Sequence, residues 1–115
     1  MAWRSVKLTL NNETDQPLHQ LGAHLDHGVW VKEPPATISP NSAATWESES
    51  HGFLIGTAGW VQYRVESMPG SAELRWKNPF VGRSDFPHEP PPGYETTSTV
   101  GRGSNAMVIF TLKKK

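Results

Sequence analysis

The stretch that decides the fold is residues 60–76, "WVQYRVESMPGSAELRW". In both halves apolar residues alternate with polar ones: Val61, Tyr63 and Val65, then Ala72, Leu74 and Trp76. An alternation with period two is typical of a β-strand that buries one face. Between the halves, the segment from Met68 to Ser71 contains Pro69-Gly70, which is a turn signal. The stretch therefore predicts a hairpin of two neighbouring strands.

The same alternation recurs on both sides of this hairpin. It is found in "VKLTLN" (6–11), "LGAHLD" (21–26) and "ATWES" (44–48), and two further strand-like runs follow, the threonine-rich "YETTSTV" (94–100) and "AMVIFTL" (106–112). In 21–26 it predicts that Leu21, Ala23 and Leu25 share the face opposite His24, and 106–112 is apolar on both sides, as a central strand is. With turn residues between the runs and no helical stripe, the sequence predicts an all-β fold. We expect one antiparallel β-sandwich domain over residues 1–115.

Composition excludes several classes of function. The chain has 115 residues and no cysteine, so it contains neither a disulfide framework nor a thiolate nucleophile. Its 11 basic and 11 acidic residues cancel, which argues against a nucleic-acid binder, because such proteins carry a basic excess. No apolar run approaches the roughly 18 residues that span a bilayer, and residues 1–12 lack the apolar core of a signal peptide. The chain is expected to be made as a soluble protein.

No catalytic or metal site is predicted. His24 and His27 lie three apart, so on a regular strand they face opposite sides and share no metal without a bulge. Ser50 and His51 stand near Ser48, but no G-x-S-x-G elbow surrounds them. The glycines of "GFLIGTAG" (52–59) lack the lysine of a phosphate loop and are expected to form a tight connection into the strand beginning at Trp60. We expect no enzyme activity and no cofactor.

Aromatic residues in irregular segments are the strongest functional signal. Residues 75–94, "RWKNPFVGRSDFPHEPPPGY", contain five prolines, two glycines and four large aromatic residues. Trp46, Tyr63, Trp76 and Phe110 follow the apolar phase of strands and are expected to be core. A second group is flanked by glycine, proline or polar residues: Trp30, Phe80, Phe86 and Tyr94. Rings at a membrane interface place an apolar body in lipid and a polar edge in water, so this group predicts contact with a lipid surface.

Longer blocks give the chain a resemblance to a known family. They are "LTLNNET" (8–14), "LDHGVWVKEPPATI" (25–38), "WESESHGFLIGTAGWVQY" (46–63), "LRWKNPFVGRSDF" (74–86) and "GRGSNAMVIFTL" (101–112). In order and spacing they resemble the aegerolysin family, and within it the small component of a bacterial binary insecticidal crystal toxin. The resemblance implies an antiparallel β-sandwich without enzyme activity. It also implies binding to membrane lipids, often sphingolipids, together with a larger partner protein that forms the pore.

The resemblance also implies a site. The block 74–86 carries the family's lipid-contacting aromatics, which correspond here to Trp76, Phe80 and Phe86, and the "HGVW" block adds His27 and Trp30. Fungal members often have tryptophan where Phe80 and Phe86 stand, and His27 appears in place of another tryptophan. With Tyr94 these residues form the predicted lipid-binding set. The resemblance implies a protein stored in the cytoplasm or in an inclusion that acts outside the cell, at target membranes.

Two other functions fit the same residues. A lectin-like sandwich could use the loop aromatics as stacking platforms for sugar rings. An edge-strand association domain could use them as the apolar centre of a protein interface. The sequence does not decide which lipid or receptor is bound, which partner protein is used, or which oligomeric state is formed.

Overall fold

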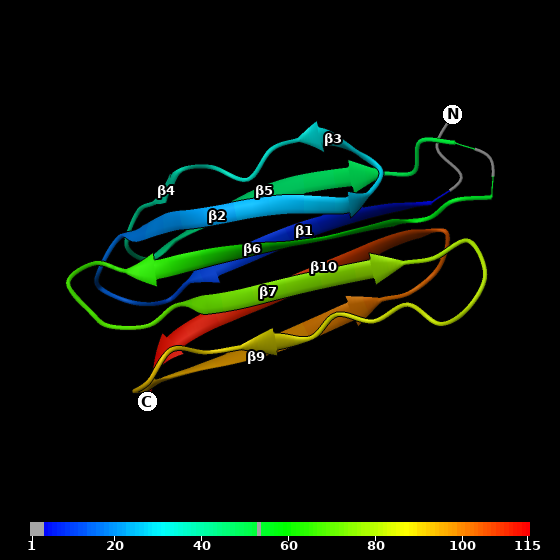
Figure 1. Ribbon diagram of the computed structural model, residues 1–115. Helices are drawn as coiled ribbons and strands as arrows, with labels where there is room; N and C mark the ends of the chain where they lie inside the picture. The colour runs from blue at the N-terminus through cyan, green and yellow to red at the C-terminus, as the bar shows by residue number, and fades with distance from the viewer. Residues whose placement is uncertain (1–3, 53) are drawn as a thin grey trace.

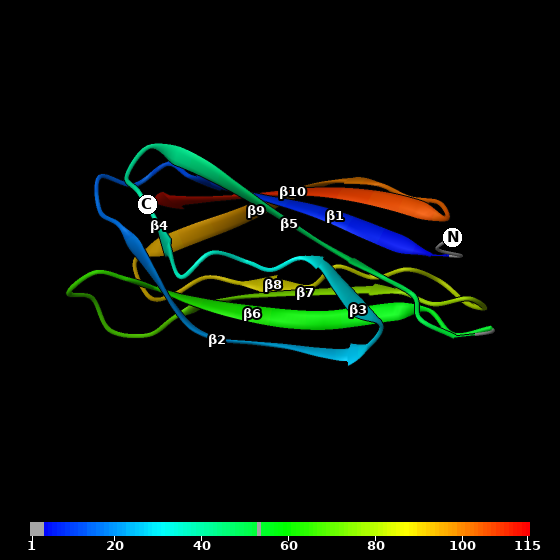
Figure 2. The same cartoon turned by 90° about the horizontal axis from the view of Figure 1, so that it is seen from above.

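The fold consists of two five-stranded sheets packed face to face (Figures 1 and 2). A computed structural model describes residues 4–52 and 54–115. The strands are β1 (Ser5–Asn12), β2 (Leu18–His27), β3 (Val29–Lys32), β4 (Thr37–Ile38), β5 (Ser42–Glu49), β6 (Thr57–Val65), β7 (Ala72–Asn78), β8 (His88–Glu89), β9 (Tyr94–Gly101) and β10 (Asn105–Lys114). One sheet has the order β3-β5-β1-β10-β9 and the other β4-β2-β6-β7-β8. The predicted all-β sandwich is confirmed.

The hairpin predicted over residues 60–76 is present as β6 and β7. The two strands pair antiparallel, with Val61 opposite Leu74 and Tyr63 opposite Ala72. Ser67 and Gly70 take positive φ angles in the turn between them, which is the conformation that tight turns require. β6 begins at Thr57 rather than at Trp60, so the strand is longer than the alternation alone indicated.

One pair of strands departs from the expected antiparallel arrangement. β1 and β10 lie side by side and run parallel, with Val6 opposite Ala106 and Leu10 opposite Phe110. Both strands are flanked by antiparallel neighbours, β5 and β9. The alternation of apolar residues specifies which face of a strand is buried but not the direction of its neighbour. The parallel pair could therefore not be predicted from the pattern.

Strand β2 contains two irregularities that change which side chains face outward. Its register with β6 shifts between Gln20 and Gly22 and again between Leu25 and His27. The first shift leaves Leu21 55% exposed, so the prediction that it shares a buried face with Ala23 and Leu25 is wrong. A β-bulge inserts one residue and moves the following side chain to the other face.

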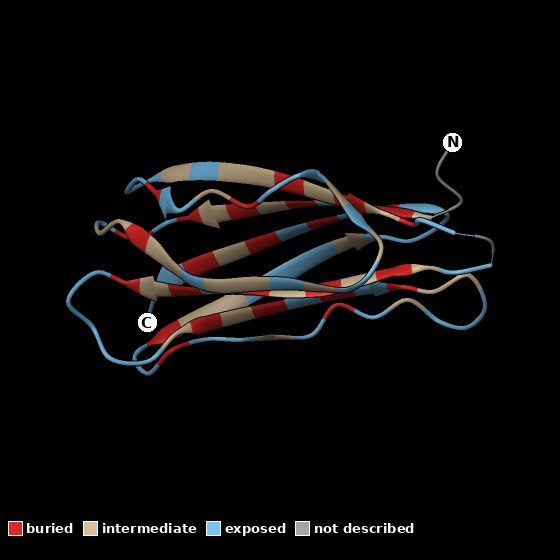
Figure 3. Cartoon of the chain, turned by 45° about the horizontal axis from the view of Figure 1, so that its top comes forward, coloured by how far each residue is buried: buried red, intermediate tan, exposed pale blue. Residues whose placement is uncertain are grey.

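The core fills the space between the sheets along the length of the molecule (Figure 3). Its largest fully buried side chains are Trp46, Trp76, Tyr63 and Phe110, all four of which the strand phase predicted to be core. The sandwich measures 43 × 21 × 20 Å. Over residues 4–52 and 54–115 no helix is long and apolar enough to cross a bilayer.

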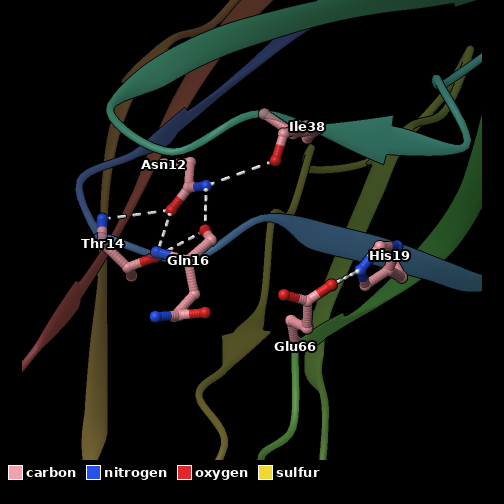
Figure 4. A network of polar contacts seen from close by, with 6 residues as sticks. All are labelled: Asn12, Thr14, Gln16, His19, Ile38 and Glu66. Atoms are coloured by element: carbon pink, nitrogen blue, oxygen red, sulfur yellow. Dashed lines mark hydrogen bonds and ion pairs between the residues drawn. The ribbon is translucent and has the colours of Figure 1, made fainter.

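A buried asparagine fixes the connections at each end of the sandwich. At the end of β1, Asn12 Nδ2 donates to the carbonyls of Gln16, Ile38 and Ser39, and Asn12 Oδ1 accepts from Thr14 (Figure 4). At the opposite end, Asn78 Nδ2 donates to the carbonyls of Ser5, Gly103 and Ser104. We call the Asn78 end, where residues 50–52, 54–56 and 79–86 lie, the tip (Figure 1).

Candidate functional site

Trp76 lies inside the sandwich, beneath the tip. It is 1% exposed, and its ring stands between those of Trp30 and Trp46, with centroid separations of 5.9 and 6.2 Å. This close packing needs Gly59 on the neighbouring strand, because a Cβ there would come within 2.8 Å of the Trp76 ring. As placed, Trp76 has no ring face to offer to a lipid.

A directed chain of hydrogen bonds connects Trp76 with the β2–β3 turn. The indole Nε1–H of Trp76 donates to Ser48 Oγ at 3.0 Å, and Ser48 Oγ lies 2.7 Å from Thr57 Oγ1. The Thr57 hydroxyl donates to the carbonyl of His27 at 3.1 Å, so the Ser48 hydroxyl donates to Thr57. Each of these buried polar groups is therefore satisfied.

The prediction of surface rings is wrong for two of the loop aromatics. Phe86 is 6% exposed and Tyr94 is 5% exposed, and both belong to the core. The guanidinium of Arg102 lies 5.9 Å from the centre of the Phe86 ring. Tyr94 stands at the end of the sandwich opposite the tip, where it pairs with Lys114. These residues do not form one patch with the other predicted lipid contacts.

Trp30 is partly buried at the edge of the sandwich. It lies on β3, opposite Ser48 of β5, and packs against the core and against Trp76. Gly28, two residues before Trp30, has a φ of 101°, and a Cβ at this position would collide with the carbonyl oxygen of Glu49. Only glycine fits this turn, which gives a structural reason for the glycine in the "HGVW" block.

The structure brings Phe80 and His27 together at the tip. Both line an open cavity of about 310 Å³, with Leu54, Ile55, Lys77 and Val81 among its other walls. Phe80 is partly exposed. Arg4 stacks on the Phe80 ring, with its guanidinium carbon 4.6 Å from the ring centre. The same guanidinium donates to the carbonyls of Pro79 and Phe80, so Arg4 fixes the ring and the backbone of this loop together.

Aliphatic side chains, which the sequence reasoning missed, form the most exposed apolar surface of the tip. Val81 is 85% exposed, Leu54 is 54% exposed and Ile55 is 43% exposed. A signal was present, since the pair Leu54-Ile55 stands between Gly52 and Gly56, and Val81 precedes Gly82. Apolar residues between glycines in a connection have no sheet in which to bury themselves.

No metal or nucleophile site is assembled in the described part of the chain. It contains no group of three histidine, cysteine or acidic residues that could hold a metal ion. The second β2 irregularity puts both His24 and His27 on the outer side, opposite Trp60 and Ala58. On a regular strand, the spacing of three residues would have placed His24 and His27 on opposite faces. Ser48 Oγ is engaged by Trp76, and Ser50 Oγ accepts from the backbone N–H of Arg4.

Comparisons with known proteins show which solved structures share this fold. No family model matches the chain. The lipid binding protein Nakanori superposes with a TM-score of 0.83 at 12% identity, covering 99% of this chain and 73% of Nakanori. IP-1A from Alcaligenes faecalis superposes with a TM-score of 0.77 at 16% identity, covering 99% of this chain and 94% of IP-1A. At these identities the likeness establishes a shared fold.

One relative is similar in sequence. The uncharacterized protein DDB_G0272682 of Dictyostelium discoideum is 30% identical over 112 residues, which is 96% of this chain. The chain spans 10% of the length of that relative. A domain of this kind therefore also occurs as a small part of a much larger protein.

Proposed function

We propose that the protein is a non-enzymatic membrane-lipid-binding module that docks through its tip. The observation that carries the proposal is the clustering of Leu54, Ile55 and Val81 beside the cavity that contains Phe80 and His27. The shared fold with a protein named for lipid binding supports it, as does the aegerolysin resemblance of the sequence blocks. Membership of that family is part of the proposal.

The apolar surface of the tip is sufficient for reversible docking. Each aliphatic side chain transferred fully from water to an apolar environment contributes about 1.5–3 kcal/mol. Three such side chains together match the lower estimates of the cost of immobilising a protein at a surface, which gives weak and reversible binding. Phe80 adds ring area at the same place, and Arg4 keeps the ring in a defined position.

Vesicle sedimentation tests the tip directly. Wild type should pellet with phosphatidylcholine vesicles containing sphingomyelin, and Val81→Ser and Leu54→Ser should each reduce the bound fraction about threefold to tenfold. Phe80→Ala should also weaken binding. Met68→Ser is the matched control, since Met68 is 38% exposed in the hairpin at the opposite end. Equal binding by wild type and both tip variants would contradict the assignment of the site.

We also propose that the module is the small half of a two-component pore-forming toxin. This proposal rests on the resemblance, which implies a sphingolipid-type headgroup and a larger partner protein. The purified chain should then bind dye-loaded vesicles without releasing the dye. Release by the chain alone would show that it perforates membranes unaided and would remove the need for a partner.

A further inference from the structure

A second binding surface lies on the outer face of the β2-β6-β7 sheet, one outward-facing residue pair further along the strands than Ala58 and Lys77, which line the tip cavity. Its centre is Trp60, which follows the polar phase of β6 together with Gln62 and Arg64. Trp60 is partly exposed and pairs with His24 of β2 and Arg75 of β7. The lipid-binding proposal makes no use of this tryptophan.

The indole of Trp60 lies across the neighbouring strand as a flat platform. A Cβ built on Gly22 would stand 3.5 Å from the outer ring carbons Cη2 and Cζ3 of Trp60, so the ring extends over the one residue of β2 that has no side chain. His24 stands beside it, with a ring-centroid separation of 6.2 Å. The indole therefore reaches toward β2 and stays partly exposed.

A polar cleft lies on the β7–β8 side of Trp60, whose cross-strand partner Arg75 forms one of its walls. Glu73, Arg75, Pro87, His88 and Glu89 line an open cavity of about 250 Å³. Arg75 Nε and Nη2 contact the same carboxylate oxygen, Glu73 Oε1, at 2.8 and 2.7 Å. Within residues 4–52 and 54–115, the other oxygen of Glu73 therefore remains available as an acceptor. The Arg75 side chain stays 48% exposed, so donors and acceptors are both presented.

We propose that Trp60 and this cleft bind a neutral carbohydrate. A pyranose ring has an apolar C–H face that stacks on an indole and a rim of hydroxyl groups that pair with carboxylate and guanidinium groups. From β2, over which the indole lies, to β8 the surface spans three strand spacings, or about 14 Å, which accommodates a short oligosaccharide. A lipid surface fits less well, because docking here would desolvate Arg75 and Glu73. A protein partner fits less well because of Glu73, since acidic residues are depleted from protein interfaces.

Side-chain indole resonances provide the test. The wild-type protein, labelled with ¹⁵N, is titrated with glucose, galactose, mannose, N-acetylglucosamine, N-acetylgalactosamine and lactose, and Trp60 is assigned from the spectrum of Trp60→Phe. The Trp60 indole signal should shift saturably with at least one of these sugars, while the signals of the buried Trp46 and Trp76 stay in place. Glu73→Gln should weaken binding of that sugar about tenfold, as measured from the shift of the Trp60 signal, and calorimetric titration should show a similar loss for Trp60→Ala.

The controls separate this surface from the tip. Val81→Ser should bind the sugar as wild type does, and Trp60→Phe should pellet with vesicles as wild type does. Glu73→Gln keeps the Trp60 signal, so the test survives even if Trp60→Ala does not fold. The proposal is overturned if none of the sugars moves the Trp60 signal. It is also overturned if sphingomyelin-containing vesicles move that signal and the sugars do not.

Discussion

At the residue scale, the buried hydroxyl of Tyr63 is expected to make the protein less stable as the pH rises through the alkaline range. Burial raises the pKa of the Tyr63 hydroxyl to about 12 from its ordinary value of 10.0, and the hydroxyl donates to the carbonyl of Pro35 at 2.7 Å. The folded state therefore keeps this proton where the unfolded chain loses it. The stabilisation is complete below pH 10 and is lost as the pH rises from about 10 through about 12.

Denaturant titrations from pH 9 to 12 measure this effect. The free energy of unfolding of wild type should fall by about 2–3 kcal/mol more than that of Tyr63→Phe across this range. Because Tyr63→Phe lacks only the hydroxyl, other groups that titrate there contribute equally to both proteins. If the free energies of unfolding of wild type and Tyr63→Phe fell in parallel with pH, Tyr63 would not be the cause of the alkaline loss of stability.

The fate of individual aromatics shows what local sequence does and does not report. Strand phase predicted the burial of Tyr63 and Trp76 correctly, because alternation directly encodes the side of the sheet. The residues that flank Phe86 describe an irregular backbone, but not whether the ring turns inward. A bridge between Lys77 and Asp85 brings this segment back to β7, which places Phe86 against the core. Such a single bridge between residues eight apart leaves no periodic signal in the sequence.

At the scale of elements, the asparagines at the two ends of the sandwich allow a comparison. Asn78→Ala and Asn12→Ala each remove a buried amide that donates to three backbone carbonyls. Each should lower the free energy of unfolding by about 1–3 kcal/mol. Only Asn78→Ala loosens the start of residues 79–86, so only this variant should also weaken vesicle binding. Denaturant melts and sedimentation on the same samples measure both effects.

One result would contradict the expected difference between Asn78→Ala and Asn12→Ala. If Asn12→Ala weakened vesicle binding as much as Asn78→Ala, docking would depend on overall stability and not on the order of the tip. Neither network was predicted from the sequence, because an asparagine between strands resembles any turn residue. The β2 irregularities were equally hidden, and they decide that Leu21 faces outward and that His24 stands beside Trp60.

At the scale of the whole molecule, the sequence predicted two packed sheets, but not the order of the strands within them or the direction in which neighbouring strands run. The positions of the long strands followed from alternation, whereas the order of strands and the parallel β1–β10 pair depend on contacts between residues about 100 apart in the chain. The tip forms where two connections meet at one end of paired strands. Residues 54–56 and 79–81 meet because β6 and β7 are neighbours, with Thr57 opposite Asn78.

The balance of charge over the whole molecule predicts how docking responds to salt. The 11 basic and 11 acidic residues give a formal net charge of zero, and the apolar side chains of the tip gain free energy from leaving water, which salt does not screen. Binding to zwitterionic vesicles should therefore change by less than about twofold between low and physiological ionic strength. Sedimentation at a series of salt concentrations measures this directly. Loss of binding at physiological salt would instead assign docking to the exposed Lys77 and Arg83, and Val81→Ser would then bind as wild type does at low salt.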